Sequence, residues 1–354
     1  MHAVTHRAVI VTAAVSMSLS LAACGKAGGG DSNDKGSSTK IGLLLPENKT
    51  ARYEALDKPQ FEKAVAAACA DCEVVYNNAV SDVVKQKQQF DQLIADGVKV
   101  IALDPVDATK AAAWVADAKA KGVRIVAYDR AVAGADAYVS HDNTKVGELQ
   151  GQALLAALGA KAATAKVVMI NGDEKDPNAA LFKKGAHSAL DGKVGKVVYE
   201  ASGEWDPKIA GEKMSAAISS VGKSGIGAVY SANDGMAGGV ITSLENAGIR
   251  DIPVGGQDAE AAGIQRIIAG SQTFTIYKSP LQLAPEAAKF AVNLLKGKEP
   301  GAQGATDGVP STLFPPVVVD RKNIQSTVIK DGIYRASELC TPDLAARCTA
   351  LGVK

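Results

Sequence analysis

Short apolar runs alternate with amphipathic stretches along most of this chain. In its first third, the runs have the length of buried strands and the stretches carry apolar residues at helical spacing. The predicted strands cover residues 41–45, 73–76, 100–103, 125–128 and 138–140, and the predicted helices cover 53–70, 83–96 and 108–121. Continuous apolar strands separated by helices indicate a parallel sheet covered on both faces. This part of the sequence predicts one doubly wound α/β domain.

The same alternation starts again at a helix over 143–158, which predicts a second α/β domain. Its predicted strands cover residues 167–170, 197–201, 228–231 and 254–256. The remaining segment is too small for a third domain: a strand at 274–277, a helix at 281–296, a Gly- and Pro-rich stretch at 297–316, and a short strand at 317–319. We expect these pieces to complete the two sheets, so that three chain crossings form a hinge. The predicted lobes are 40–142 with about 278–312, and 143–277 with about 313–339, followed by a tail at 340–354.

The N-terminal segment has the pattern of an export signal. An apolar run over residues 8–21 follows the early positive charge and is too short to span a bilayer. It ends in Leu21-Ala22-Ala23-Cys24, which resembles a bacterial lipobox, where the Cys is acylated and becomes the first mature residue. Residues 1–23 are therefore a predicted lipoprotein signal peptide, and Cys24 is the predicted lipidation site. We expect the protein at the outer face of the cell membrane, extracytoplasmic or periplasmic.

Residues 24–39 are rich in Gly and Ser and hold almost nothing that could enter a core. Such a segment is a flexible tether with an r.m.s. reach of about 20 Å. A disordered tail without a function would have the same composition, and only the predicted lipidation site, Cys24, favours a tether.

The other cysteines fall into two local pairs, Cys69 with Cys72 and Cys340 with Cys348. In an exported protein we expect both pairs to form disulfides. A redox dithiol at Cys69 and Cys72 would need a helix N-terminus, whereas this pair closes a predicted helix. A four-Cys zinc site would have to join distant parts of the chain, so no metal site is predicted.

Composition and charge exclude several classes of protein. The 354 residues are 47% hydrophobic and 22% charged, which is typical of a soluble globular chain. Lys and Arg total 39 against 38 for Asp and Glu, with no basic run interleaved with aromatics. Nucleic acid is therefore not an expected partner.

Polar residues follow nearly every predicted strand. In open parallel sheets, ligands bind outside the carboxyl ends of the strands. The residues at these ends are Asp104, Asp129, Arg130, Asp142, Asn143, Asn171, Asp173, Asn233, Asp234, Gln257, Asp258 and Lys278. For Asp104, Asp142 and Asp173, a role as a helix N-cap is an equally good interpretation.

This set of groups suits a ligand with adjacent hydroxyls. Carboxylates accept from hydroxyls, guanidinium groups donate, and amides do both. The glycine patterns that cradle phosphates and dinucleotides are incomplete, so no nucleotide or other cofactor is predicted. Asp129, Asp234 and Asp258 could serve a glycosidase, but hydroxyl binding explains them without a raised pKa.

Catalytic histidines are scarce. After export only His141 and His187 remain, and His187 lies in the predicted helix 179–190. We therefore expect no enzyme activity.

Aromatic residues that could stack on a sugar face are few. Trp205 lies in a loop between a strand and a helix, and Tyr53 follows the first strand. Both are candidates for binding, although ordinary loop packing would also explain Trp205. Trp114 shares a helix face with Ala111 and Ala118, which favours packing.

Four stretches resemble a known family: 125–130 (IVAYDR), 142–150 (DNTKVGELQ), 232–239 (ANDGMAGG) and 256–260 (GQDAE), the last leading to 267–270 and 275–278. In this order they resemble the periplasmic sugar-binding proteins of type I fold that serve bacterial ABC importers, in particular the xylose-binding and multiple-sugar-binding members. The resemblance covers about residues 40–339. It is specific for the family and less specific for one sugar.

The resemblance implies a cleft between two lobes that close around a neutral monosaccharide, such as xylose or a similar pentose or hexose. It implies that Arg52, Asp129, Arg130, Asn178, Asp234, Asp258 and Lys278 line this cleft, with Tyr53 and Trp205 near the faces of the sugar. Three anions, Asp129, Asp234 and Asp258, would then balance three cations, Arg52, Arg130 and Lys278. The implied partners are an ABC permease and its ATPase, and we expect a monomer.

Two positions depart from the xylose-binding pattern. Tyr53 stands where a Trp is expected, and Pro177 stands in place of an Asn. The sequence therefore leaves the preferred sugar open. A sugar receptor for a sensor or chemotaxis protein remains an alternative, and a surface glycosidase or sugar oxidoreductase is a less favoured one.

Overall fold

The computed structural model describes residues 39–354. The predicted signal peptide, Cys24 and nearly all of the tether lie outside the described residues. Within this described part, no helix combines the length and the hydrophobicity needed to cross a membrane.

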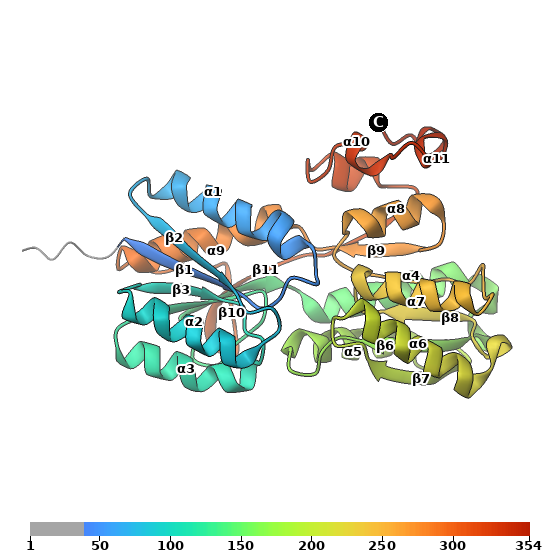
Figure 1. Ribbon diagram of the computed structural model, residues 1–354, viewed down its shortest axis with the longest axis horizontal. Helices are drawn as coiled ribbons and strands as arrows, with labels where there is room; N and C mark the ends of the chain where they lie inside the picture. The colour runs from blue at the N-terminus through green and yellow to red at the C-terminus, as the bar shows by residue number, and fades with distance from the viewer. Residues whose placement is uncertain (1–38) are drawn as a thin grey trace, which may run out of the picture. The chain divides into compact units, whose positions relative to one another are not determined.

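The first sheet has seven strands in the order β10-β11-β5-β4-β3-β1-β2 (Figure 1). Its parallel strands are β1 (Lys40–Leu45), β2 (Glu73–Asn78), β3 (Val100–Leu103), β4 (Arg124–Tyr128), β5 (Ala137–His141) and β11 (Val309–Phe314), and only β10 (Gly304–Thr306) is antiparallel. Alternate side chains enter separate cores on the two faces. The sheet is thus buried on both sides, as its continuous apolar strands predict.

Two helices cover each face of this sheet. On one face α1 (Lys58–Ala68) and α9 (Pro280–Leu295) pack through Phe61 and Phe290. On the other, α2 (Val83–Ala95) and α3 (Ala108–Ala120) pack through Phe90 and Trp114, whose ring centroids are 6.2 Å apart. Trp114 is therefore a packing residue. The helix expected over 53–70 begins with a π-helical turn, η1 (Tyr53–Asp57), before α1.

The second group of strands holds β6 (Lys166–Asn171) between β7 (Lys196–Ser202) and β8 (Ala228–Ser231), with β9 (Phe274–Tyr277) paired antiparallel to β12 (Val317–Asp320). The strand expected at 254–256 is not a regular strand, because only one bridge, Val229 to Val254, forms there. Gly255 N–H still donates to Val229 O, and Ile276 N–H donates to Gly256 O. This segment therefore links β8 to β9 by backbone hydrogen bonds without ladder geometry.

The helices around these strands are α4 (Asn143–Leu158), α5 (Pro177–Leu190), α6 (Pro207–Val221), α7 (Asp234–Asn246) and α8 (Ala261–Ala269), with short 3₁₀ turns η2 (Gly159–Thr164) and η3 (Lys223–Gly225). Glycines let α4 and α5 approach closely. A Cβ on Gly147 would lie 1.9 Å from Phe182 O, and one on Gly185 would lie 2.1 Å from Thr144 O. This close packing fixes the start of α5, which carries several site residues.

The Gly- and Pro-rich stretch at 297–316 contains two strands that the sequence does not predict. Its hairpin of β10 and β11 adds to the first sheet, and β11 runs parallel to β5. The chain thus leaves the first sheet after β5, returns to it after β9 through α9 and β11, and leaves it again for β12 across Pro315 and Pro316.

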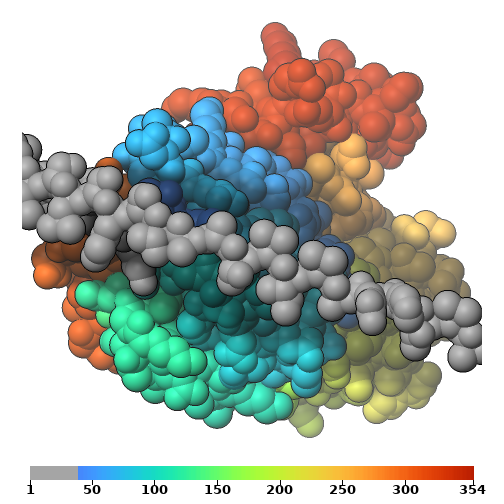
Figure 2. Space-filling view, turned by 60° about the vertical axis from the view of Figure 1, so that its left-hand side comes forward, coloured from blue at the N-terminus to red at the C-terminus, as the bar shows by residue number. Residues whose placement is uncertain are grey.

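The C-terminal segment packs on α8. It contains η4 (Gln325–Ile329), α10 (Ala336–Leu339) and α11 (Ala345–Leu351), and its apolar residues share a core with Ile264, Ile267 and Ile268 of α8. In the space-filling view, these C-terminal residues, in red, form one mass against the orange part of the chain (Figure 2). The C-terminal segment therefore covers the outer face of α8.

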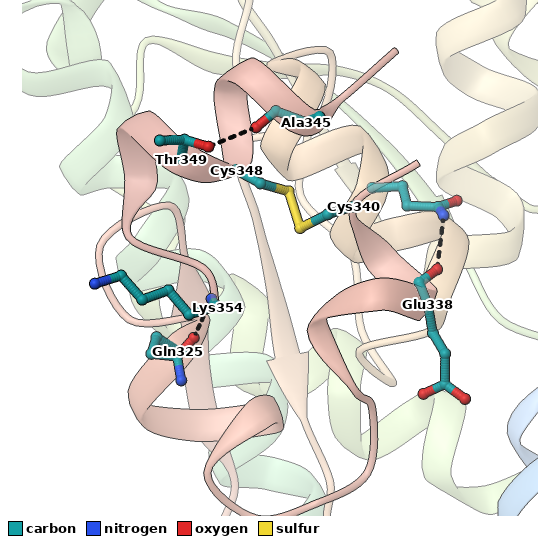
Figure 3. Close-up of a disulfide and its surroundings, with 8 residues drawn as sticks. Gln325, Glu338, Cys340, Ala345, Cys348, Thr349 and Lys354 are labelled. Atoms are coloured by element: carbon teal, nitrogen blue, oxygen red, sulfur yellow. Dashed lines mark hydrogen bonds between the residues drawn. A yellow bond between two sulfur atoms is a disulfide. The ribbon is translucent and has the colours of Figure 1, made fainter. Parts of the chain in front are cut away.

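Both predicted cysteine pairs are disulfides in the structure. Cys340 and Cys348 join α10 to α11, and Gln325 accepts a hydrogen bond from the Lys354 backbone beside them (Figure 3). Cys69 and Cys72 close the C-terminal end of α1 just before β2.

Candidate functional site

A pocket lies where the carboxyl ends of strands in the first sheet meet those of the second group of strands. It is lined by Thr50, Arg52, Tyr53, Asp129, Arg130, Asp176, Asn178, Phe182, Trp205, Gln257, Asp258 and Lys278. Eight of the nine predicted binding residues are in this set, and Asp234 is not. The space left between the side chains is about 20 Å³, roughly that of one water molecule. A larger ligand therefore enters only if the walls separate.

Arg52 lies at the centre of the charges. It follows β1 in the turn before η1, and its side chain is 1% exposed. Its Nη1 lies 3.0 Å from Asp57 Oδ1, its Nη2 bonds Asp129, and its Nε lies 3.5 Å from Asp258 Oδ1. The guanidinium carbon is 4.7 Å from the Tyr53 ring centroid. One buried cation thus faces three carboxylates that come from different parts of the chain.

Asp129 follows β4 and is a carboxylate at neutral pH. Burial by itself would raise its pKa, but the charges of Arg52 and Lys278 outweigh this effect and hold the pKa well below its usual range. The hydroxyl of Tyr53 donates to Asp129 Oδ2 at 3.0 Å. Asn178 Nδ2 donates to Asp129 O at 3.1 Å. The two cations and Tyr53 therefore hold Asp129 as an anion, and Asn178 binds its backbone carbonyl.

Arg130 is held by two other carboxylates. Its Nε lies 3.3 Å from Asp104 Oδ1 and 3.0 Å from Asp176 Oδ2, and its Nη1 donates to Pro105 O at 3.1 Å. Asp104 is thus not a helix N-cap, since Asp107 caps α3. Asp142 does cap α4, and Asp173 accepts from Lys175 N–H in a turn.

One wall of the pocket combines a cation that follows β9 with aromatic rings on α5 and after β7. Lys278 Nζ lies 3.1 Å from Asp258 Oδ1 and 5.1 Å from the Phe182 ring centroid. Trp205 is 6% exposed and stands edge-on to Phe182, with centroids 6.3 Å apart. Trp205 therefore lies in the pocket wall, and it also packs on a neighbouring ring.

Asp234 corrects the predicted set. It begins α7 and is fully buried. Its carboxylate accepts hydrogen bonds from Glu260 N–H, Gln272 Nε2 and Thr275 Oγ1. The balance of three anions against three cations is therefore wrong for this pocket. The acids around the three cations are Asp57, Asp104, Asp129, Asp176 and Asp258.

Four residues of the pocket wall are not among the predicted ones: Thr50, Asp176, Phe182 and Gln257. Gln257 is among the strand-end residues named from the sequence, but not among the nine that the family resemblance implies. Asp176 is the N-cap of α5, and its side chain accepts from Asn178 N–H while facing Arg130. No sequence signal distinguishes Phe182 from an ordinary core residue.

Of the two histidines in the described residues, His141 and His187, neither lines the pocket. His141 is buried at the end of β5, and burial lowers its pKa well below the usual value, so it is neutral. His187 pairs with Asp191 and Glu200 on α5 and β7.

Comparisons with known proteins identify the family of this chain. A family model for the periplasmic binding protein domain matches residues 41–299. This chain belongs to that family. It is 35% identical over 312 residues to the D-xylose-binding periplasmic protein of Escherichia coli, covering 85% of this chain and 92% of that one. It is 29% identical to the multiple sugar-binding periplasmic receptor ChvE of Rhizobium radiobacter, covering 86% and 93%.

A solved structure supports the same assignment. An ABC transporter solute-binding protein of Clostridium phytofermentans with bound β-D-glucose has a TM-score of 0.76 and 27% identity, covering 85% of this chain and 99% of that one. The predicted α/β fold of type I is confirmed, and the chain is a binding protein rather than an enzyme.

Three residues of the pocket in this periplasmic binding protein have a left-handed backbone. The φ angles are +59° at Asp129, +55° at Trp205 and +92° at Asp258. Residues with a Cβ seldom adopt this region, and such outliers gather at functional sites. Six other described residues with a Cβ share this conformation outside the pocket, so the backbone outliers support the site without locating it by themselves.

The pocket walls also hold buried polar atoms without a hydrogen-bond partner. Trp205 Nε1 is a donor and Gln257 Oε1 is an acceptor, and neither has a hydrogen-bond or ion-pair partner among the described residues. Such atoms are rare in protein interiors because each costs free energy. Together they leave the pocket able both to donate and to accept.

Proposed function

We propose that this protein is a lipid-anchored extracytoplasmic receptor that captures a neutral monosaccharide and delivers it to an ABC permease. Xylose or a similar pentose or hexose is the proposed ligand. The observation that carries the proposal is a pocket wall of charged and amide groups in which one buried donor, Trp205 Nε1, and one buried acceptor, Gln257 Oε1, have no partner among the described residues. Each sugar hydroxyl both donates and accepts, so a polyol can satisfy both kinds of atom.

The charges favour a neutral ligand over a sugar phosphate. Arg52 and Arg130 already face the carboxylates of Asp57, Asp104, Asp129 and Asp176, and Lys278 faces Asp258. A phosphate would bring further negative charge beside buried carboxylates, which is costly. The relatives support the same class, since those named above bind D-xylose, multiple sugars and β-D-glucose.

The proposed mechanism is closure of two lobes, made of residues 40–142 with about 278–314 and 143–277 with about 315–339. The boundary predicted near 312 moves to 314 because β11 pairs with β5 of the first sheet. Contacts that join the two lobes include Arg130 to Asp176, Arg52 to Asp258, and Ala51 N–H to Glu260 Oε1 at 3.0 Å. With about 20 Å³ between the walls, these contacts must part for a sugar to enter. The ligand then shifts the equilibrium back to the closed form by its contacts with both lobes.

The proposed site residues are Arg52, Tyr53, Asp129, Arg130, Asn178, Trp205, Asp258 and Lys278, and we include Thr50, Asp176, Phe182 and Gln257 because they line the same pocket. Lipidation at Cys24, a tether over 24–39, and a permease with its ATPase as partners belong to the same proposal. We also propose that the protein acts as a monomer.

Titration calorimetry with a panel of monosaccharides tests the proposed ligand class. We expect xylose or a related neutral sugar to bind and to raise the melting temperature, because a ligand of the folded state stabilises it. The matched comparison is each sugar against its phosphate ester. Tighter binding of the ester, or no binding by any neutral sugar, would contradict the proposal.

The anchor is tested separately by Cys24→Ala in cells. The wild-type protein should fractionate with membranes and incorporate a labelled fatty acid, and the variant should do neither. Equal labelling of both proteins would remove Cys24 as the lipidation site.

A further inference from the structure

Asp234 is placed to control a residue of the pocket that it does not itself contact. Its carboxylate accepts three hydrogen bonds, from Glu260 N–H at 2.9 Å, Thr275 Oγ1 at 2.9 Å and Gln272 Nε2 at 2.6 Å. All three donors lie C-terminal to Gly256: Glu260 on the loop after that residue, Gln272 just before β9, and Thr275 within β9. One buried side chain thus binds the turn after 254–256 and the strand beside it.

The backbone of Asp234 binds the other end of the same turn. Its N–H donates to Gln257 O at 2.9 Å, while its carboxylate accepts from Glu260 N–H. Between these two points lie Asp258 and Ala259, both left-handed, with φ of +92° and +50°. Two successive residues with a Cβ in this region are disfavoured unless surrounding contacts hold them. Asp234 supplies contacts at both ends of this turn.

Thr275 adds a hydrogen bond to the middle of the turn. Its hydroxyl donates to Asp234 Oδ2 and accepts from Ala259 N–H at 3.1 Å. Asp258 N–H in turn donates to Ile276 O at 2.8 Å. The turn is therefore fixed against β9, and Asp258 is aimed at Lys278 and Arg52.

The space around Asp234 is shaped for its carboxylate. A Cβ on Gly256 would lie 2.1 Å from Asp234 Oδ1, and a Cβ on Gly263 would lie 2.3 Å from Oδ2. Burial raises the pKa of Asp234 to about 7, so the group is costly to keep as an anion in the interior. A merely apolar contact would avoid this cost, and the hydrogen bonds to the turn are what the carboxylate adds.

We propose that Asp234 is a positioning residue for ligand binding, which acts by fixing the turn that carries Asp258 into the pocket. The inference rests on the proposed function, because it assigns to Asp234 a role in sugar binding through Asp258.

The test is a double-mutant cycle on the full-length protein, with the tightest-binding neutral monosaccharide and titration calorimetry. Asp234→Ala and Thr275→Val should each weaken binding by about tenfold or more. Thr275→Val keeps the side-chain shape, so it serves if Asp234→Ala fails to fold. Asp258→Asn provides the background for the cycle, since it retains the shape of Asp258 and loses its charge.

The cycle separates positioning from a general structural role. If Asp234 acts through Asp258, Asp234→Ala and Thr275→Val should have little effect in the Asp258→Asn background. Each should then weaken sugar binding by less than about threefold. Equal losses in both backgrounds would overturn the inference. If the wild type binds the sugar and both single variants bind it equally tightly, the inference is also overturned. Absence of sugar binding in the wild type would overturn the proposed function as well.

A control shows that lower stability alone does not weaken binding. Asp82 caps α2 through Val84 N–H and Lys85 N–H and does not line the pocket. Asp82→Ala should lower the melting temperature by loss of the cap and leave sugar affinity unchanged. A tenfold loss of affinity in this control would overturn the assignment to Asp234.

Discussion

The indole of Trp205 lies directly against the backbone of Gly172. A Cβ at position 172 would be 2.1 Å from Trp205 Cζ2, far inside contact distance. Gly172 follows β6 and Trp205 follows β7, so the strand ends of neighbouring strands fix this ring in the pocket wall.

Gly172→Ala should therefore displace the ring and weaken sugar binding by about tenfold or more. Emission of Trp205, recorded in a Trp114→Phe background, should shift with the substitution. Gly304→Ala is the matched control, because a Cβ there would come no closer than 3.9 Å to a neighbour. Unchanged affinity and emission in Gly172→Ala would mean that the ring does not depend on this contact.

Asp258→Ala should weaken sugar binding by about 2 to 4 kcal/mol, since a charged acceptor is lost and Lys278 and Arg52 are left without it. Calorimetry measures this as a fall in affinity of roughly thirtyfold to several hundredfold. Asp173→Ala removes the same chemical group at another strand end outside the pocket and should have no effect. A change of less than about threefold in Asp258→Ala would exclude Asp258 from the site.

Most of the pocket could be located from the sequence because parallel strands of one sheet present their carboxyl ends at one edge. Asp234 is an exception for a local reason. Asn233 caps α7 through Met236 N–H, and its Nδ2 lies 3.4 Å from Thr50 Oγ1 in the pocket wall. The side chain of the next residue then points away from the pocket. A difference of one position around a helix cap is not visible in the sequence.

Other misses have different physical causes. β11 is hidden among Gly and Pro residues, and its pairing with β5 depends on a sheet edge that forms only in the folded chain. Asp57 and Phe182 lie on helical segments, where their types fit a surface or a core as well as a site. The disulfides were predictable because each joins cysteines that are close in sequence.

Sugar affinity should depend on pH through Glu260. Burial raises its pKa to about 8 in the closed form, with repulsion from Asp234 and Asp258 adding to the shift. Opening the lobes parts Glu260 from Ala51 and admits water, which returns the pKa toward its ordinary value of 4.5. Closure therefore takes up a proton between these two values.

A carboxyl that is protonated only in the closed form favours closure at low pH. Affinity should be highest at and below pH 4.5, fall as the pH rises from there, and level off above about pH 8. Calorimetry in buffers with different ionisation enthalpies should register the proton uptake. Glu260→Gln should flatten the profile, and an unchanged slope in that variant would assign the pH dependence to other groups.

Replacing Cys340 and Cys348 by Ser should lower the free energy of unfolding by about 2.5 kcal/mol, from the loop that the disulfide closes. The disulfide between Cys69 and Cys72 closes a shorter loop, and its removal should cost about 2 kcal/mol. Urea unfolding of both double variants measures the two values. Stabilities equal to that of the wild type would show that these disulfides do not constrain the unfolded chain.

The path of the chain between the two sheets limits how the protein can be divided. A gene fragment that stops after β5 would omit α9, which covers one face of the first sheet, and β11, which pairs with β5. A fragment that begins at α4 and stops after β9 would leave out β12, the partner of β9. Neither half is a contiguous piece of the gene, so independent expression of a lobe requires a rearranged reading frame in which distant segments are rejoined by new linkers.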